Sequence, residues 1–210
     1  MQIENLSIGY KGNAVCENFS LSINQGEMIG LKGRNGRGKT TLLKTICGLI
    51  PPIKGCVIFN GMNIHSMSAI ERAKCISIVL TQRVLLQGIT VRSLVEMGRY
   101  PNLGRFHFED KMDEPFIDNC LFKLGITHLA AKPLAEISDG ELQKAMIARA
   151  LAQQTPIILM DEPTAFLDYV AKAELFELLS SLVSNEGISV LFSSHDIEGM
   201  QRVATRVVEL

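Results

Sequence analysis

The sequence predicts an α/β fold: a parallel sheet covered by helices, with antiparallel strands before it and a helical segment inserted into it. Three observations predict this. Apolar and polar residues alternate at 2–10 and 14–23 as in short strands, a glycine-rich loop joins an apolar run to a helical stretch, and the apolar run 157–160 ends in two acids. Continuous apolar runs that alternate with helices indicate a sheet covered on both faces.

Composition narrows the class of protein. The chain has 210 residues and a net charge of −1, so nothing in its charge suggests nucleic acid as a partner. No apolar run reaches the roughly 18 residues that span a bilayer, and the first residues lack the basic head and apolar core of an export signal. The five cysteines are scattered without CxxC spacing, which argues against a zinc site and fits a reducing cytosol.

The N-terminal part is predicted to consist mainly of strands. Apolar and polar residues alternate in its first two segments, and an apolar run then leads into the glycine-rich loop. Helical spacing follows the loop, and we expect Pro51 and Pro52 to stop that helix. The predicted elements are strands at 2–10, 14–23, 28–31 and 55–59 and a helix at 41–49.

The middle of the chain is predicted to be helical, with helices at 90–98, 109–124 and 139–153. After it the pattern returns to β–α–β, with strands at 157–160 and 188–193 around a helix at 170–185. We therefore expect a single domain over 1–210. Residues 1–85 and 155–210 would form the α/β core with its antiparallel β subdomain, and 86–154 the inserted helical subdomain.

The run from Gly33 to Thr40 matches the phosphate-loop pattern G-x-x-x-x-G-K-[ST]. Its glycines let backbone N–H groups surround phosphate oxygens, Lys39 reaches the β and γ phosphates, and the Thr40 hydroxyl ligates Mg²⁺. The helix that starts beside Lys39 adds its positive N-terminal end. The predicted ligands of ATP in this run are Gly33, Asn35, Gly36, Gly38, Lys39, Thr40 and Thr41.

The two acids after the strand at 157–160 are the second half of the predicted phosphate site. We expect this strand to lie next to the phosphate-loop strand, which would put Asp161 near the Mg²⁺. Glu162 would then orient or deprotonate the attacking water. The alternative is a pair of acids that merely caps the next turn.

The run Ile137–Glu141 precedes a long predicted helix, and Ser138 with Glu141 forms a capping box. Together with the other motifs, however, it resembles the ATP-binding cassette (ABC) ATPases, whose LSGGQ signature stands at this distance before the acidic strand. The resemblance covers essentially the whole chain. It implies that Ser138 and Gly140 bind the γ-phosphate held by the other subunit of a dimer. Asp139 replaces the usual glycine, so we expect its carboxylate to point away from the phosphate.

The same resemblance assigns four more residues. It implies that Gln82 contacts Mg²⁺ and water, that Asp168 belongs to the D-loop, and that His195 is the switch histidine. Tyr10 occupies the place of the aromatic residue that stacks on adenine. Arg37 departs from the family, which has a small polar residue there. The implied activity is ATP hydrolysis with Mg²⁺ by a head-to-tail homodimer in which Glu162, His195 and Gln82 are catalytic.

Residues 90–101 resemble a stretch in the ATPases of iron–siderophore, haem and cobalamin importers. This implies integral-membrane permease partners, indirectly a substrate-binding protein, and a peripheral location on the cytoplasmic face of the cell membrane. Members of the family usually continue with a further hairpin and helix, so we expect a C-terminus that is truncated relative to the family.

Several alternatives share parts of this pattern. A soluble cassette ATPase without a permease, acting in cofactor assembly or as an ATP-gated scaffold, would carry every motif named above. DNA-repair cassettes insert coiled coils between the phosphate motifs, and this sequence has no heptad run. A P-loop kinase or GTPase would need neither the 137–141 motif nor His195. A regulatory subunit without hydrolysis is disfavoured because Glu162 and His195 are present.

Overall fold

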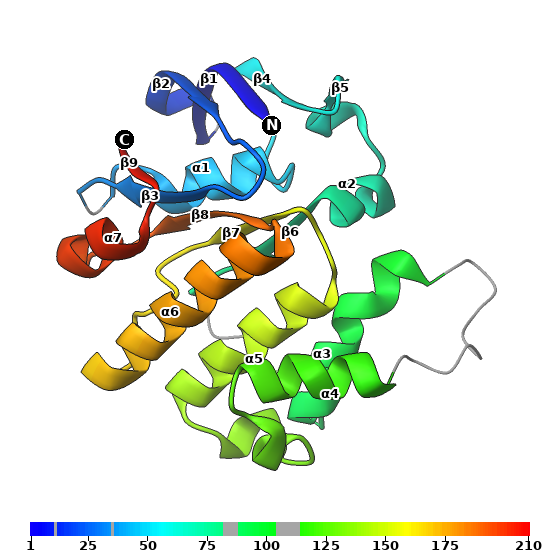
Figure 1. The fold of residues 1–210 in the computed structure, drawn as a ribbon. Helices are drawn as coiled ribbons and strands as arrows, with labels where there is room; N and C mark the ends of the chain where they lie inside the picture. The colour runs from blue at the N-terminus through cyan, green and yellow to red at the C-terminus, as the bar shows by residue number, and fades with distance from the viewer. Residues whose placement is uncertain (11, 35, 82–87, 104–113) are drawn as a thin grey trace.

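The computed structural model describes residues 1–10, 12–34, 36–81, 88–103 and 114–210. Its N-terminal part forms a four-stranded antiparallel sheet in the order β2-β1-β4-β5. Figure 1 shows this sheet at the top of the molecule. Its strands are β1 Gln2–Tyr10, β2 Asn13–Ser22, β4 Lys54–Phe59 and β5 Met62–Asn63.

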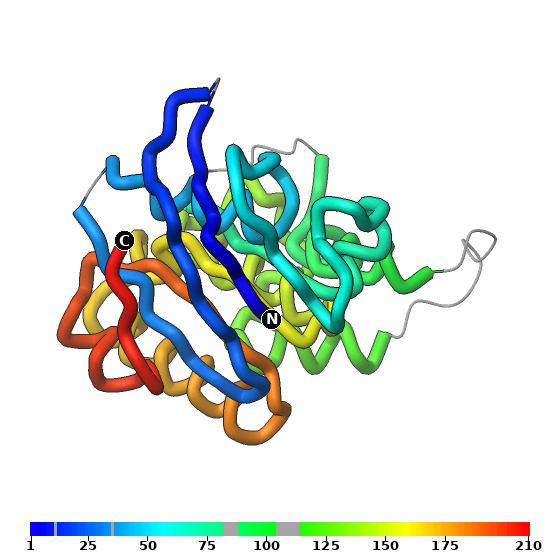
Figure 2. Tube along the Cα trace, turned by 90° about the horizontal axis from the view of Figure 1, so that it is seen from above, coloured from blue at the N-terminus to red at the C-terminus, as the bar shows by residue number. Residues whose placement is uncertain are grey.

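A second sheet is parallel and has five strands in the order β6-β7-β8-β3-β9. Seen from above, the antiparallel strands cross over it, and the C-terminal strand lies beside β3 (Figure 2). Every residue of β7 and β8 is buried, as expected for strands covered on both faces. The strands are β3 Met28–Lys32, β6 Ile76–Val79, β7 Ile157–Met160, β8 Ser189–Ser193 and β9 Arg206–Glu209.

Helices cover both faces of the parallel sheet. In Figure 1, α1 lies between the two sheets, whereas α6 and α7 lie on the opposite face and α3, α4 and α5 pack together beyond α6. The α-helices are α1 Lys39–Ile46, α2 Ala69–Cys75, α3 Val91–Glu96, α4 Glu114–Lys123, α5 Asp139–Ala152, α6 Tyr169–Glu186 and α7 Ile197–Val203. Short 3₁₀ turns are η1 Ile64–Ser66, η2 Met97–Asn102, η3 Thr127–Leu129 and η4 Leu134–Glu136.

Each face of the sheet has its own apolar core, because successive side chains of a strand point to opposite faces. Along β8, Leu191 packs in the core around α1, while Val190 and Phe192 pack in the core that α6 shares with α3, α4 and α5. The predicted α/β class with an antiparallel β part is therefore confirmed. Within the described part of the chain, none of the helices has both the length and the apolar character needed to cross a membrane.

Two local expectations differ from the structure. The helix after the phosphate loop ends at Ile46, well before Pro51 and Pro52, because Gly48 adopts the left-handed conformation (φ 77°) that terminates helices. The prediction that the acidic strand lies next to the phosphate-loop strand is also wrong, since β8 lies between β7 and β3. The carboxyl ends of all five parallel strands still meet at one edge of the sheet, so residues from β3 and β7 can approach each other there.

Candidate active site

The phosphate loop connects β3 to α1. Gly36 and Gly38 both have left-handed backbones, with φ of 76° and 97°. A Cβ atom at Gly38 would lie 2.8 Å from Val15 Cγ1, so the β1–β2 hairpin leaves room for glycine alone at this position. Gly38 precedes the first turn of α1 and offers no side-chain cap, which leaves the first N–H groups of the helix open to an anion.

Lys39 stands in the first turn of α1 and is only 7 % exposed. Its Nζ donates a hydrogen bond to the Gly33 carbonyl at 2.8 Å and lies 3.9 Å from Glu162 Oε1. The ammonium group is therefore held over the loop, between the backbone of the loop and the acid that follows β7.

Thr40 and Asp161 meet at the carboxyl edge of the sheet. The Thr40 hydroxyl donates to Asp161 Oδ2 at 2.7 Å, and Ser193 donates to Asp161 Oδ1 at 2.8 Å. Both Thr40 and Asp161 present oxygen atoms, which are the ligands that Mg²⁺ prefers. Mg²⁺ typically takes its other ligands from phosphates and water. In the described part of the chain no group of three or more His, Cys, Asp or Glu residues could hold a metal ion. The oxygens of Thr40 and Asp161 fit a cation that takes its other ligands from a nucleotide and water.

Glu162 follows β7 and contacts the loop of His195. The His195 backbone N–H donates to Glu162 Oε2 at 3.0 Å, and His195 Nε2 lies 3.2 Å from Glu162 Oε1. That second contact lacks hydrogen-bond geometry, so the buried Oε1 has no aligned donor. Burial raises the pKa of Glu162, while the nearby His195 and Lys39 oppose the rise. A carboxylate with a free oxygen and a raised pKa is suited to accept a proton.

The backbone of Glu162 is unusual. Its φ is 49°, a left-handed conformation that costs a residue with a side chain about 1–3 kcal/mol and is often found at functional sites. The Glu162 N–H donates to Ser193 Oγ at 3.0 Å, and the neighbouring Thr81 hydroxyl donates to the Asp161 carbonyl at 2.8 Å. Sequence reasoning missed both hydroxyl residues. The available signal was a serine at the end of the otherwise apolar run before His195.

The predicted signature motif, residues 137–141, lies at the start of helix α5. Ser138 is its N-cap and forms a complete capping box with Glu141: Ser138 N donates to Glu141 Oε2 at 2.8 Å, and Glu141 N donates to Ser138 Oγ at 3.3 Å. A Cβ atom at Gly140 would lie 3.2 Å from the Phe166 carbonyl. Asp168 caps α6 by accepting from Ala171 N at 2.8 Å. The start of α5 and residues 166–168 therefore line one open groove, of about 460 Å³.

The structure brings the predicted site residues together in two groups. Lys39, Thr40, Asp161, Glu162 and His195 form one connected set, and Ser138, Gly140 and Asp168 line the groove at the start of α5. Among the described residues, no hydrogen bond or ion pair joins the second group to the first. Figure 1 shows the helices α1 and α5 on opposite sides of the parallel sheet.

The remaining predicted residues are placed as follows. Tyr10 ends β1 beside the hairpin and is 52 % exposed, whereas Thr41 is buried in α1. Arg37 is exposed in the phosphate loop. The predicted ligands Asn35 and Gln82 lie outside the described residues.

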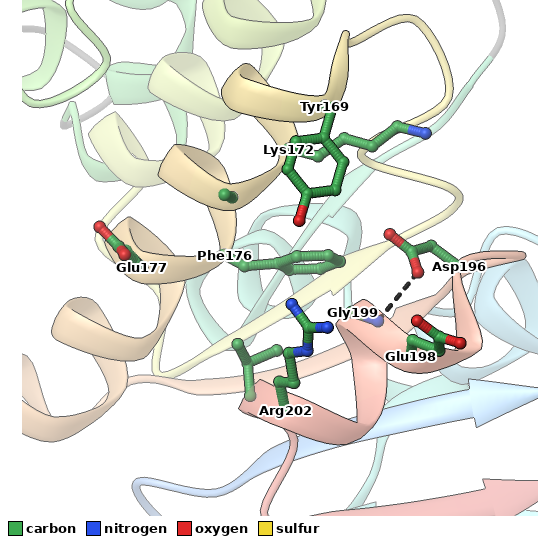
Figure 3. Close-up of a pocket in the computed structure, with 10 residues that line it drawn as sticks. Tyr169, Lys172, Phe176, Glu177, Asp196, Glu198, Gly199 and Arg202 are labelled. Atoms are coloured by element: carbon green, nitrogen blue, oxygen red, sulfur yellow. Dashed lines mark hydrogen bonds between the residues drawn. The ribbon is translucent and has the colours of Figure 1, made fainter.

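A groove beside the loop of His195 lies between α6 and α7 (Figure 3). Asp196 caps α7 by accepting from Gly199 N at 2.8 Å. A Cβ atom at Gly199 would lie 2.8 Å from Phe176 Cε2, so α7 packs closely against α6. This packing fixes the segment that carries His195.

Comparison with known proteins agrees with this geometry. The family model described as "ABC transporter" matches residues 16–165. An uncharacterized ABC transporter ATP-binding protein of Methanocaldococcus jannaschii is 40% identical over 207 residues, covering 99% of this chain and 71% of the relative. The ferric enterobactin transport ATP-binding protein of Escherichia coli is 37% identical over 207 residues, covering 99% and 76%.

A solved structure has the same fold. The ATP-binding cassette MJ0796, determined as a dimer in a post-hydrolysis state with ADP and Pi bound, superposes with a TM-score of 0.89 at 27% identity. The match covers 100% of this chain and 93% of that one. A phosphate loop joined to an acid pair and a histidine, in a fold and sequence shared with these proteins, identifies the chain as an ATPase of the ABC transporter family.

Proposed function

We propose that this chain powers the import of an iron complex, either a siderophore or haem, or of cobalamin. In this proposal two copies associate head to tail, bind two ATP molecules between them and drive a permease at the cytoplasmic face of the cell membrane. A substrate-binding protein would deliver the cargo to the permease. The name of the ferric enterobactin relative and the importer-like stretch at 90–101 support this choice of cargo.

The chemistry of the first group follows from its contacts. Lys39 binds the β and γ phosphates, and the phosphate-loop N–H groups surround their oxygens. Thr40 and Asp161 would hold Mg²⁺, which when bound neutralises charge on the phosphates. Glu162 accepts the proton of the attacking water at its free Oε1, and His195 orients that carboxylate through its backbone N–H at 3.0 Å. Tyr10, at the exposed end of β1, would stack on the adenine.

The observation that carries the proposal of a dimer is the separation of the two groups. Ser138 and Gly140 offer a helix N-terminus to an anion, yet α5 lies on the other side of the parallel sheet from α1, which follows the phosphate loop (Figure 1). A second copy would place its own start of α5 over the γ-phosphate. Closure then completes each site, and loss of the γ-phosphate opens it. The dimeric state of the similar cassette MJ0796 supports this arrangement.

We further propose that the helical subdomain, residues 86–154, transmits closure of the dimer to the permease. It carries the groove at the start of α5, so movement of the partner copy acts on it directly. Gln82 would couple the same motion to the Mg²⁺ and the water.

Co-purification tests the proposal. The Glu162→Gln variant is tagged, membranes are extracted in mild detergent with Mg-ATP, and the proteins that co-purify are identified. We expect a multi-span permease in stoichiometric amount, and a Lys39→Ala variant treated in parallel should recover less of the second ATPase copy. If the protein brings down soluble partners alone, the importer proposal is wrong. The alternative, a soluble cassette ATPase acting in cofactor assembly or as an ATP-gated scaffold, then replaces it.

A further inference from the structure

Ser193 ends β8 at the carboxyl edge of the parallel sheet. Its exposed fraction is 0%, and it pairs with Leu31 of β3, two residues before the phosphate loop begins at Gly33. A hydroxyl in so buried a position is costly unless it is hydrogen-bonded. The identity of its partners therefore indicates what it does.

Both partners belong to the acid pair. Ser193 Oγ donates to Asp161 Oδ1 at 2.8 Å and accepts from the Glu162 N–H at 3.0 Å. A serine hydroxyl has one proton to donate, so this pattern uses its proton on the carboxylate and a lone pair on the amide. One side chain thus joins the carboxylate of the first acid to the backbone of the second.

The consequences for Asp161 and Glu162 are different. Asp161 Oδ2 accepts from Thr40 at 2.7 Å, so the bond from Ser193 to the other oxygen fixes the carboxylate against rotation. In Glu162 the bond holds the N–H of a residue whose φ is 49°. Without the hydroxyl, that N–H would lose its partner, and the left-handed backbone of Glu162 would lose a restraint.

We propose that Ser193 is a positioning residue for ATP hydrolysis, keeping Asp161 and Glu162 in fixed relation. It acts through these two residues and does not itself touch the nucleotide. The proposal rests on the function proposed above for Glu162. It accounts for a buried serine at the end of β8, the strand that lies between β7 and β3.

The test compares Ser193→Ala with Ser189→Ala. Ser189 lies at the other end of the same strand, is 3% exposed, and donates to the Asn24 carbonyl at 2.8 Å, away from the acids. We expect Ser193→Ala to lower kcat about 10–100-fold with little change in the KM for ATP, because small displacements of catalytic groups have effects of about this size. Ser189→Ala should keep kcat within about twofold of the parent value. Its melting temperature should fall about as much as that of Ser193→Ala, because each variant loses one buried hydrogen bond.

Binding of ADP provides a readout that does not depend on turnover. We expect Ser193→Ala to bind ADP normally in EDTA and to gain less affinity than the parent when Mg²⁺ is added, because Asp161 is no longer held. In Ser189→Ala the gain on adding Mg²⁺ should equal that of the parent. An equal gain in both variants would overturn the proposal.

A second pair of variants covers the case in which Ser193→Ala folds poorly. Ser193→Thr and Ser193→Val have nearly the same shape and differ in the hydroxyl, so the threonine variant should retain most of kcat and the valine variant should not. Equal kcat in the two would contradict the proposal.

The Glu162→Gln variant separates the two claims. If Glu162→Gln is inactive while Ser193→Ala turns over at the parent rate, the inference about Ser193 fails alone. If Glu162→Gln turns over at the parent rate, the proposed function of the site fails first.

Discussion

The two groups of site residues are held in place by different kinds of contact. The phosphate-loop group is Lys39, Thr40, Asp161, Glu162 and His195, and the signature group is Ser138, Gly140 and Asp168. In the first, hydrogen bonds join residues far apart in sequence: Thr40 and Asp161 are separated by 121 positions and Ser193 and Asp161 by 32. In the second, Ser138 and Glu141 are three positions apart. The residues at the phosphate loop therefore depend on the packing of β3, β7 and β8 together, whereas the signature residues are held within the first turn of α5.

The two groups also differ in exposure. Lys39 and Asp161 are 7 % and 5 % exposed, whereas Ser138 is exposed at the start of its helix. A buried, interlocked group can bind phosphate within one chain. An exposed helix start with its cap already satisfied is suited to meet a ligand presented by another molecule. The residues at the phosphate loop are therefore held by contacts within the chain, whereas the start of α5 faces outward.

The largest expected effect is a loss of turnover after a change in the phosphate-loop group. Glu162→Gln keeps the shape of the side chain but removes the group that accepts a proton, so we expect turnover to fall by at least about 100-fold. The ATP-bound dimer should persist, because ATP is no longer hydrolysed and the two copies stay associated. Phosphate release and light scattering after size exclusion with Mg-ATP measure the two properties. Hydrolysis at the parent rate would show that another group accepts the proton.

Lys39→Ala should act one step earlier, on binding. Removal of a hydrogen bond to a charged group costs about 1.5–3 kcal/mol, which corresponds to a loss of roughly 10–100-fold in ATP affinity. Calorimetric titration with ATP measures this loss. Ser68→Ala serves as the control and should bind ATP as the parent does, because Ser68 caps α2 and belongs to neither group of site residues. Unchanged affinity in Lys39→Ala would contradict the assignment of the phosphate loop.

The chain offers a matched pair of capping boxes with which to sharpen the comparison. Ser68 caps α2 with Glu71 in the same pattern as Ser138 caps α5 with Glu141. Ser68→Ala and Ser138→Ala should each lower the free energy of unfolding by about 1 kcal/mol, the usual value of an N-cap. Ser138→Ala alone should also reduce turnover and ATP-driven dimerisation. If the two variants lose turnover equally, Ser138 has no function beyond its cap.

The smallest expected effect concerns an ion pair outside both groups. Glu27 precedes β3 and contacts Arg206 of β9, with Arg206 Nε 2.5 Å from Glu27 Oε1. Burial alone would raise the pKa of Glu27, but hydrogen bonds from Arg206 and from Asn24 outweigh it, so the pKa is lowered. A lowered folded-state pKa stabilises the fold above the unfolded pKa, and this stabilisation is lost as the pH falls through the folded value.

We therefore expect Glu27→Gln to lower the free energy of unfolding by about 1 kcal/mol at pH 7, a modest value because Arg206 is partly exposed. The difference from the parent should shrink as the pH falls below about 4, the ordinary pKa of glutamate. Denaturant titrations at several pH values measure it, and the kcat for ATP should stay at the parent value. A difference that grows toward acid would contradict the sign.

Local patterns in the sequence predicted most of the elements but not their order in space. Strands such as Ile157–Met160 were predicted because a continuous apolar run identifies a buried strand. The position of β8 between β7 and β3 could not be predicted, because strand order depends on how distant segments pack. The segment that forms α2 and β6 was not assigned either, since its short elements have weak periodicity.

In the site, too, local motifs could be predicted from the sequence, whereas contacts between distant residues could not. The phosphate loop and the acid pair are contiguous motifs, so residues such as Lys39 and Glu162 could be named from sequence. Ser193 could not, because its role depends on contact with residues 31 and 32 positions away. A serine at the end of an apolar run indicates a buried hydroxyl, but the sequence does not say which residues it contacts.

The left-handed backbone of Glu162 has a consequence for directed evolution. Glycine and asparagine adopt that conformation with less strain than glutamate, and neither would supply the carboxylate that contacts His195. A library selected purely for heat resistance should therefore enrich these residues at position 162 and discard the reaction in the process. Thermostabilised variants of this cassette will keep ATP hydrolysis if every round also selects for turnover.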